Sequence, residues 1–299
     1  MTHASDRIRL MRQGRPDFSV GPKLQTIWGF REASVFSLEG LAATVMAASA
    51  TASWLPGMIG AELAMIGAVV LLFSHLGNPR AAWRAIANIR RSWISRGTAV
   101  IGAFTGLGAL LLIFALFIPA PPELVRVVYG LVVACGAFIL FYPGFAMAAS
   151  AGIPFWNTGM LPILSGLGGL STGGAAALAM APMGLSLPVS SDVALATELG
   201  LLIAIGIGII ALISASHRMG AGARLSGQLM VRREKMWFWG LAVAVGLAVP
   251  GLILAVIIWF APSPTFTVVG LCVAALGRIL GDFALRYTIL KVGTYESLL

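Results

Sequence analysis

The chain has 299 residues, of which 59% are apolar and only 10% are charged, and its mean hydropathy is +0.93. This composition lies outside the range of soluble globular domains and excludes water as the main solvent. A helix needs about 20 apolar residues to cross a hydrocarbon core about 30 Å thick, so membrane spans take up most of the chain. The composition therefore predicts an all-α, polytopic integral membrane protein and excludes a soluble catalyst.

Eight apolar stretches follow one another along the sequence. They cover residues 33–53, 57–76, 97–118, 124–148, 160–182, 193–216, 237–260 and 265–286. Backbone polar groups in lipid must be satisfied within their own segment, so each stretch is predicted to be a helix. We expect a basic N-terminal arm over 1–32, a transmembrane domain over 33–286 and a C-terminal tail over 287–299. The arm is too polar for the apolar core of a secretory signal, and no cleaved leader is expected.

Positive charges orient the predicted bundle. They gather in the arm, after the second span and after the sixth span: Arg7, Arg9, Arg12, Arg15, Lys23, Arg31, Arg80, Arg84, Arg90, Arg91, Arg96, Arg218, Arg224, Arg232, Arg233 and Lys235. The other connections carry no Lys or Arg. With an even number of spans, the basic connections and both termini share one side, which the positive-inside rule assigns to the cytoplasm. These charges serve topology and contact with anionic lipid, or they dock an acidic partner, and the sequence does not separate the two.

Ionisable residues inside the spans are the first candidates for chemistry. They are Glu39, Glu62, Glu198, Arg278 and Asp282. A central Asp or Arg costs about 2.5–3.5 kcal/mol on insertion scales, so each group must face a partner, a cavity or an interface. Arg278 and Asp282 are four residues apart on one helix face and are predicted to neutralise each other. Glu39 and Glu62 are candidates for a proton path, unless they lie near a surface and are simply hydrated.

An internal repeat is suggested by matching positions in two halves of four spans each. Ser74-His75 and Ser216-His217 occupy corresponding places, which favours a parallel duplication but is short enough to arise by chance. Small residues four apart, a spacing that lets helix backbones approach closely, occur at Gly102 with Gly106 and at Gly169 with Gly173.

The most distinctive local pattern runs from His75 to Arg96, HLGNPRAAWRAIANIRRSWISR. Its Gly-Asn-Pro sequence ends the second span, and tryptophans and isoleucines then alternate with arginines. Such a segment is predicted to lie flat on the membrane surface. His75 then lies where the second span reaches the membrane surface. Its simplest role there is that of a helix-end residue bonded to a carbonyl group.

This stretch, together with FYPGFAMAASAGIPFWNTGMLPILSGLGGLSTG at 141–173, resembles the membrane anchor subunits of the DMSO reductase and polysulfide reductase (NrfD/DmsC-like) family. The span count agrees along nearly the whole chain. The resemblance implies a bacterial inner-membrane anchor that reacts with a quinone or quinol, menaquinone or ubiquinone, in anaerobic or sulfur respiration. It also implies two partners, a ferredoxin-like iron–sulfur subunit and a molybdopterin catalytic subunit. The iron–sulfur clusters, the molybdopterin and the primary catalysis belong to these partners.

The resemblance also carries over candidate site residues. His75 matches the histidine of the family's HLG element, and its role would be to bond a quinone oxygen and exchange a proton. The family usually has Glu where this chain has Gly97, which weakens any proton path carried over from it. The remaining candidates for the quinone site, by ring stacking or hydrogen bonding, are Arg80, Trp93, Arg96, Tyr142, Trp156 and Asn157. Trp156 has the alternative role of an interface anchor.

No catalytic residues, metal-ligand cluster or haem are expected. His75 and His217 are predicted at the same face, but bis-histidine haems lie deep between helices and these residues lie at helix ends. Electron transfer weakens with distance, so the partner subunits are expected on the same, cytoplasmic, face as the quinone. The alternative function is a secondary transporter of small solutes or ions, which a duplication, Gly-rich spans and intramembrane carboxylates would also suit. A third reading is a purely structural anchor.

Overall fold

The computed structural model describes residues 22–74 and 88–296, and the predictions for His75, Arg80 and the surface segment up to residue 87 lie outside these ranges. Within the described ranges, eight helices are long and apolar enough to span a membrane, which confirms the predicted fold class. They are α2 (Phe30–Thr51), α3 (Leu55–Phe73), α5 (Trp93–Leu116), α6 (Pro122–Ala148), α7 (Met160–Met180) with the 3-10 turn η2 (Ala181–Met183), α8 (Ser191–Ser216), the π-helix η3 (Met236–Ala248) continued by α10 (Val249–Phe260), and α11 (Pro264–Lys291).

Serine caps and prolines define where several spans begin. Ser92, Ser190 and Ser263 each accept a hydrogen bond from a backbone N–H three residues later, at the first turns of α5, α8 and α11. Proline stands in the first turn of α3, α6 and α11, where its missing N–H costs nothing. Because α5 begins at Trp93, the last four residues of the predicted surface segment belong to a span. That part of the prediction is wrong.

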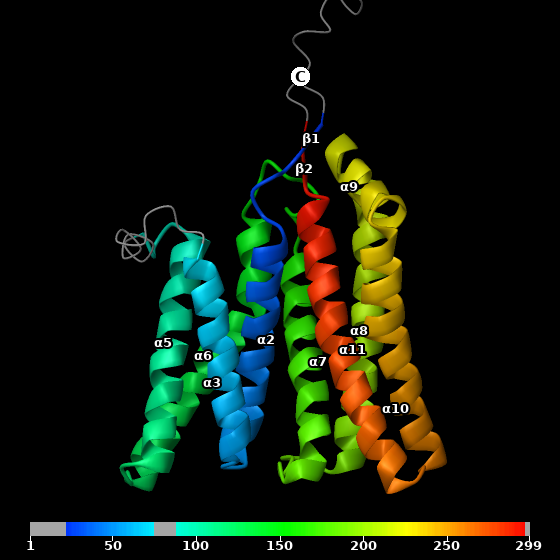
Figure 1. Cartoon of the computed structure of the whole chain (residues 1–299). Coiled ribbons are helices and arrows are strands. Elements are labelled where there is room, and N and C mark those ends of the chain that lie inside the picture. The colour runs from blue at the N-terminus through cyan, green and yellow to red at the C-terminus, as the bar shows by residue number, and fades with distance from the viewer. Residues whose placement is uncertain (1–21, 75–87, 297–299) are drawn as a thin grey trace, which may run out of the picture.

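Figure 1 shows that the spans run side by side between two ends of the bundle. The strands β1 (Lys23–Leu24) and β2 (Thr294–Tyr295), the short helix α9 (Ala221–Arg232), the end of α3 and the start of α5 lie at one end, which we call the basic rim. The connections 52–54, 117–121, 184–190 and 261–263 lie at the other end, the opposite rim. The basic segments of the described chain therefore share one side, as predicted. Their assignment to the cytoplasm stays a prediction.

The two halves of the chain have corresponding helix neighbours. In the first half α2 packs on α3 and α6, and in the second α7 packs on α8 and α11. The halves meet where α2 contacts α7 and α11, and where α6 contacts α7. This arrangement supports the predicted duplication better than the two matching dipeptides do.

Close helix crossings use some of the glycines that the sequence singled out. A Cβ atom on Gly40 of α2 would lie 2.9 Å from the Cα atom of Gly169 of α7, and one on Gly173 would lie 2.3 Å from Cβ of Thr44. The Gly169 pair thus packs helices as predicted. The Gly102 and Gly106 pair does not, because a Cβ atom at either position meets nothing within 4 Å in the described chain.

The two ends of the described chain meet at the basic rim. β1 and β2 pair in antiparallel fashion, with Lys23 opposite Tyr295 and Leu24 opposite Thr294. The side-chain nitrogen of Gln25, Nε2, donates to Leu290 O at 2.6 Å. This bond connects the segment before α2 to the end of α11. The Gly222 amide of α9 donates to the carboxylate of Glu296 at 3.0 Å, which brings α9 to the same junction.

Candidate functional site

A stack of aromatic rings joins α5 to α6 just inside the basic rim. The Trp93 ring, in the first turn of α5, lies 4.8 Å from the Phe145 ring at an interplanar angle of 8°. It also stacks on Phe138 at 6.4 Å, and Phe138 stacks on Tyr142 at 6.1 Å. Trp93 is only half-buried in the described chain, so the stack offers flat aromatic surface at the rim.

Arg96 fixes the turn that leads into α5. Its Nε atom donates to Ile89 O at 3.0 Å, and its Nη2 atom donates to Arg90 O at 2.8 Å. Its guanidinium carbon lies 4.7 Å from the centroid of the Trp93 ring, within cation–π range. Arg96 therefore places a fixed positive charge over the aromatic stack, with its other N–H groups still able to donate.

The space left by Gly97 is filled by Tyr142. A Cβ atom at Gly97 would lie 2.1 Å from Cε2 and Cζ of the Tyr142 ring, closer than any real contact. Tyr142 is 6% exposed and reaches across from α6. A side chain at position 97 would therefore collide with this tyrosine ring. The Tyr142 ring of α6 thus packs directly against α5 at Gly97.

Trp156 and Asn157 do not contact Trp93 or Arg96, although ring contacts through Trp28 and Phe36 connect Trp156 to Tyr142. Trp156 is 3% exposed, its Nε1 atom donates to Ile289 O at 3.0 Å, and its ring lies 5.6 Å from that of Trp28. It is therefore buried at the junction of the chain ends, which does not fit the alternative role of an interface anchor. The Asn157 amide nitrogen donates to Ala148 O at 2.7 Å, at the last residue of α6. Of the described candidates, only Trp93, Arg96 and Tyr142 come together.

A row of ionisable residues follows one face of α11 through the interior. Asp282 and Arg286 form a buried ion pair, with Arg286 Nε 2.7 Å from Asp282 Oδ2. Ser37 Oγ of α2 donates to the same carboxylate oxygen at 2.9 Å, and Arg286 Nη1 donates to Ser165 Oγ of α7 at 3.1 Å. Asp282 thus forms its ion pair with Arg286 and not with Arg278, although its charge still interacts with that of Arg278. The sequence missed Arg286 because the predicted span ended at that residue.

Arg278 donates to a backbone carbonyl group near the end of the π-helix and belongs to a network of four helices. Its Nη1 atom donates at 2.9 Å to Gly246 O, the carbonyl group four residues before Pro250, which has no N–H to offer it. Its Nε atom donates to Ser171 Oγ at 2.8 Å, and Ser171 Oγ donates to Glu198 Oε1 at 2.5 Å. Arg278 is 2% exposed as a residue, and its guanidinium group donates to both η3 and α7. This network joins η3, α7, α8 and α11.

The two carboxylates of the predicted proton path are both buried but differ in their surroundings. Glu39 is 1% exposed and lies close enough to Arg286 and Tyr142 for their charges to interact. Glu62 is 4% exposed, and neither of its carboxylate oxygens has a hydrogen-bond partner in the described chain. Along α2, apolar Ala42, Ala43 and Met46 separate the two neighbourhoods. The described residues therefore form no hydrogen-bonded path from Glu39 to Glu62.

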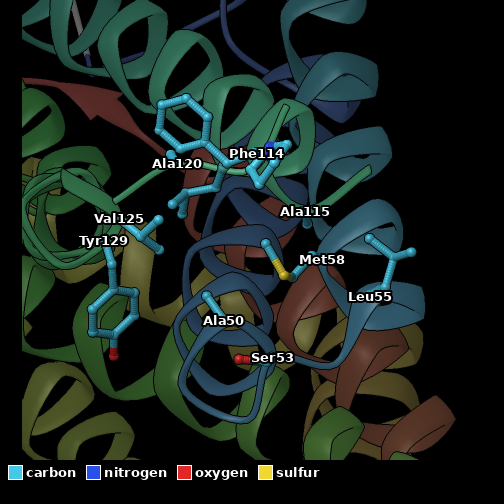
Figure 2. A pocket seen from close by; sticks show the side chains of 11 residues that line it. Ala50, Ser53, Leu55, Met58, Phe114, Ala115, Ala120, Val125 and Tyr129 are labelled. Carbon is cyan, nitrogen blue, oxygen red and sulfur yellow. The ribbon is translucent and has the colours of Figure 1, made fainter. Parts of the chain in front are cut away.

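A cavity of about 500 Å³ opens at the opposite rim between the ends of α2, α3, α5 and α6. Figure 2 shows its wall of mainly apolar side chains, with Ser53 and Tyr129 as the labelled hydroxyl-bearing residues. The Tyr129 hydroxyl is hydrogen-bonded to Thr51 Oγ1 at 2.7 Å. No basic residue lines this cavity, and it lies at the end of the bundle away from Trp93 and Arg96.

The comparison with known protein families matches residues 44–181 to the DMSO reductase anchor subunit (DmsC). No curated protein matches the chain. The matched region runs from the middle of α2 to the end of α7, and contains both stretches on which the resemblance was based. The predicted resemblance to this kind of anchor subunit is confirmed over that region.

Proposed function

We propose that this chain, similar over residues 44–181 to the DMSO reductase anchor subunit, is the membrane anchor of a molybdenum and iron–sulfur oxidoreductase. In this proposal it passes electrons between the quinone pool of the bacterial inner membrane and an iron–sulfur subunit. The observation that carries the proposal is the family match, which covers both landmark stretches of the sequence. Eight apolar helices without a large extramembrane domain in the described chain agree with an anchor.

The quinone ring would bind at the basic rim, beside Trp93, Arg96 and Tyr142. Flat aromatic surface and fixed donors are what a planar ring with two carbonyl oxygens requires. Trp93 and Arg96 supply these on the first turn of α5, and the Tyr142 phenol lies on the adjacent helix. His75 follows directly on Ser74, the residue that caps the end of α3, and it would bond a quinone oxygen and exchange the proton.

The iron–sulfur subunit would dock on the same rim. The described connections there present exposed cationic side chains, which are Arg90, Arg91, Arg218, Arg224, Arg232, Arg233 and Lys235. Such a surface favours an acidic partner and speeds its encounter. A short electron-transfer distance requires that the nearest cluster dock where the quinone binds. The positive-inside rule makes this face cytoplasmic in the proposal.

Replacing His75 by alanine is expected to lower quinol-linked turnover of the purified complex at least about tenfold, which is about 1.4 kcal/mol of lost transition-state stabilisation. The complex should still assemble, because one helix-end side chain contributes little to packing. The matched control is His217→Ala, since His217 caps the corresponding helix end in the other half. Unchanged turnover in His75→Ala would favour a purely structural anchor.

The place of the quinone is open to a direct test by photoaffinity labelling. An azidoquinone irradiated with the complex should label peptides that contain residues 75–97 or 138–145. Labelling confined to residues 50–58 and 111–129 would place the ring in the cavity at the opposite rim and contradict the proposed site.

The alternative, a secondary transporter, gains support from one feature of the interior. Arg278 lies fourteen residues after Pro264, or about 21 Å along the axis of α11, near the middle of this helix. A polar network at that depth is typical of a substrate or ion site in a transporter. Copurification separates the two functions. An anchor should bring iron–sulfur and molybdenum subunits with it from its native membrane, whereas a transporter should be stable without them.

A further inference from the structure

Glu62 is a buried carboxyl group that the proposed quinone site does not use. It is 4% exposed, and both of its oxygens lack a hydrogen-bond partner among the described residues. An ionised carboxylate is costly in apolar surroundings unless it is paired or hydrated. The Glu62 carboxyl group must therefore be protonated or have access to water.

The neighbouring helices leave room for this carboxyl group but offer it no charge. A Cβ atom on Gly108 of α5 would lie 2.3 Å from Glu62 Oε2 and 3.2 Å from the Met46 Cε atom of α2. A glycine and a methionine thus face the carboxyl group from α5 and α2. The nearest titratable group of α6 in the cavity is Tyr129, whose hydroxyl is bonded to Thr51.

The register of the helices places Glu62 directly beneath the floor of the cavity at the opposite rim. Each residue around the carboxyl group is about one helical turn deeper than a cavity-lining residue of its own helix: Glu62 below Met58, Gly108 below Leu111, and Met46 below Ala50. Figure 2 shows the Met58 side chain among the residues of the cavity wall. One turn of flexible, apolar side chains is all that separates the carboxyl group from a space large enough for many waters.

The second half of the chain has a carboxyl group at the corresponding position, and this one has hydrogen-bond partners. Glu198 comes seven residues after the start of α8, as Glu62 comes seven residues after the start of α3. Glu198 Oε1 accepts a hydrogen bond from Ser171, which is in turn bonded to Arg278. Glu62 has no such hydroxyl and no such arginine in the described chain.

We propose that Glu62 is a proton-binding carboxyl group that exchanges its proton with water of the opposite rim through this cavity. In the exchange the neutral carboxyl group gives its proton to a cavity water and becomes a carboxylate, and the reverse step restores it. No electron moves, so the inference goes beyond the proposed quinone reaction. It gives the first half of the bundle a proton site that opens to the side away from the basic rim.

Infrared spectroscopy of the full chain in lipid tests the protonation. The spectrum should contain a carbonyl band of a protonated carboxyl group that shifts when the solvent is changed to D₂O. Glu62→Gln should remove one component of this band, and any contribution of the buried Glu39 should remain. The matched control Glu198→Gln should leave the Glu62 component in place, because Glu198 already has partners. A spectrum in which Glu62→Gln removes no such component would overturn the proposal.

A second measurement tests the route without any change at Glu62. Ser53 lines the cavity and is exposed, so in a chain with Cys135 and Cys272 replaced by alanine, Ser53→Cys can be modified by a bulky maleimide after folding. The modification should slow the deuterium shift of the band at least about tenfold. The same label on Thr197→Cys, at an exposed position of α8, should not slow it. Equal exchange rates with and without the Ser53 label would show that protons reach Glu62 by another route. The quinol turnover of His75→Ala does not depend on either result.

Discussion

Replacing Arg286 by alanine is expected to destabilise the folded bundle by about 3–5 kcal/mol, because it leaves the Asp282 carboxylate buried without its ion-pair partner. The change also removes the donors that Arg286 gives to Ser165 on α7. Unfolding of the purified chain by increasing SDS in mixed micelles, followed by circular dichroism, gives the change in free energy.

The matched control for Arg286→Ala is Arg126→Ala. Arg126 pairs with Glu123 on the surface, where the two side chains are 70% and 78% exposed, and such pairs contribute about 1 kcal/mol or less. Asp282→Asn combined with Arg286→Ala should recover part of the loss, since no charge is then left unpaired. Equal free energies of unfolding for Arg286→Ala and Arg126→Ala would show that the buried pair does not stabilise the fold.

Replacing Gly281 by leucine is expected to reduce the yield of folded chain sharply, with a loss of at least about 3 kcal/mol. A Cβ atom at Gly281 of α11 would lie 2.2 Å from the Cα atom of Gly246 in η3. The clash is with backbone, so no change of rotamer relieves it and the two helices must separate. Their separation also pulls Gly246 O away from Arg278. Fluorescence-detected size exclusion and thermal unfolding measure the effect.

Gly102→Leu is the control for this crossing. Position 102 is exposed on α5, and a Cβ atom there meets nothing within 4 Å. A leucine facing lipid should change the stability by no more than about 0.5 kcal/mol. Similar losses in Gly281→Leu and Gly102→Leu would mean that leucine acts on the helices themselves and that the close approach of α11 to η3 is unimportant.

Hydropathy predicted the eight spans because each one must satisfy its own backbone in lipid, a requirement that acts on every segment separately. The end of α11 was missed for the opposite reason. The predicted span stopped at Arg286 because hydropathy treats such a charge as a boundary, whereas α11 continues to Lys291 with both Asp282 and Arg286 buried inside the bundle. They lie inside because Ser37 and Ser165, on two other helices, complete their hydrogen bonds. Such compensation depends on which helices meet, and local composition does not contain that information.

The sequence identified some residues of the candidate site but not how they pack against one another. Resemblance identified Trp93, Arg96 and Tyr142, and the structure brings these three to the basic rim. That Gly97 is matched to the Tyr142 ring could not be inferred, since the two are 45 positions apart and meet only through the packing of α5 on α6. Arg278 and Arg286 both stand four residues from Asp282, so spacing alone did not decide which one pairs with it.

The short sheet at the basic rim imposes an order of events on biosynthesis. Lys23 emerges from the ribosome early, whereas Tyr295, its partner, emerges only after all eight spans have been made. The junction closes a loop of almost the entire chain, at an entropic cost that grows only slowly with loop length. The surface at which β1, β2 and α9 meet therefore does not exist on a nascent bundle. A soluble subunit that docks over it would distinguish finished chains from unfinished ones.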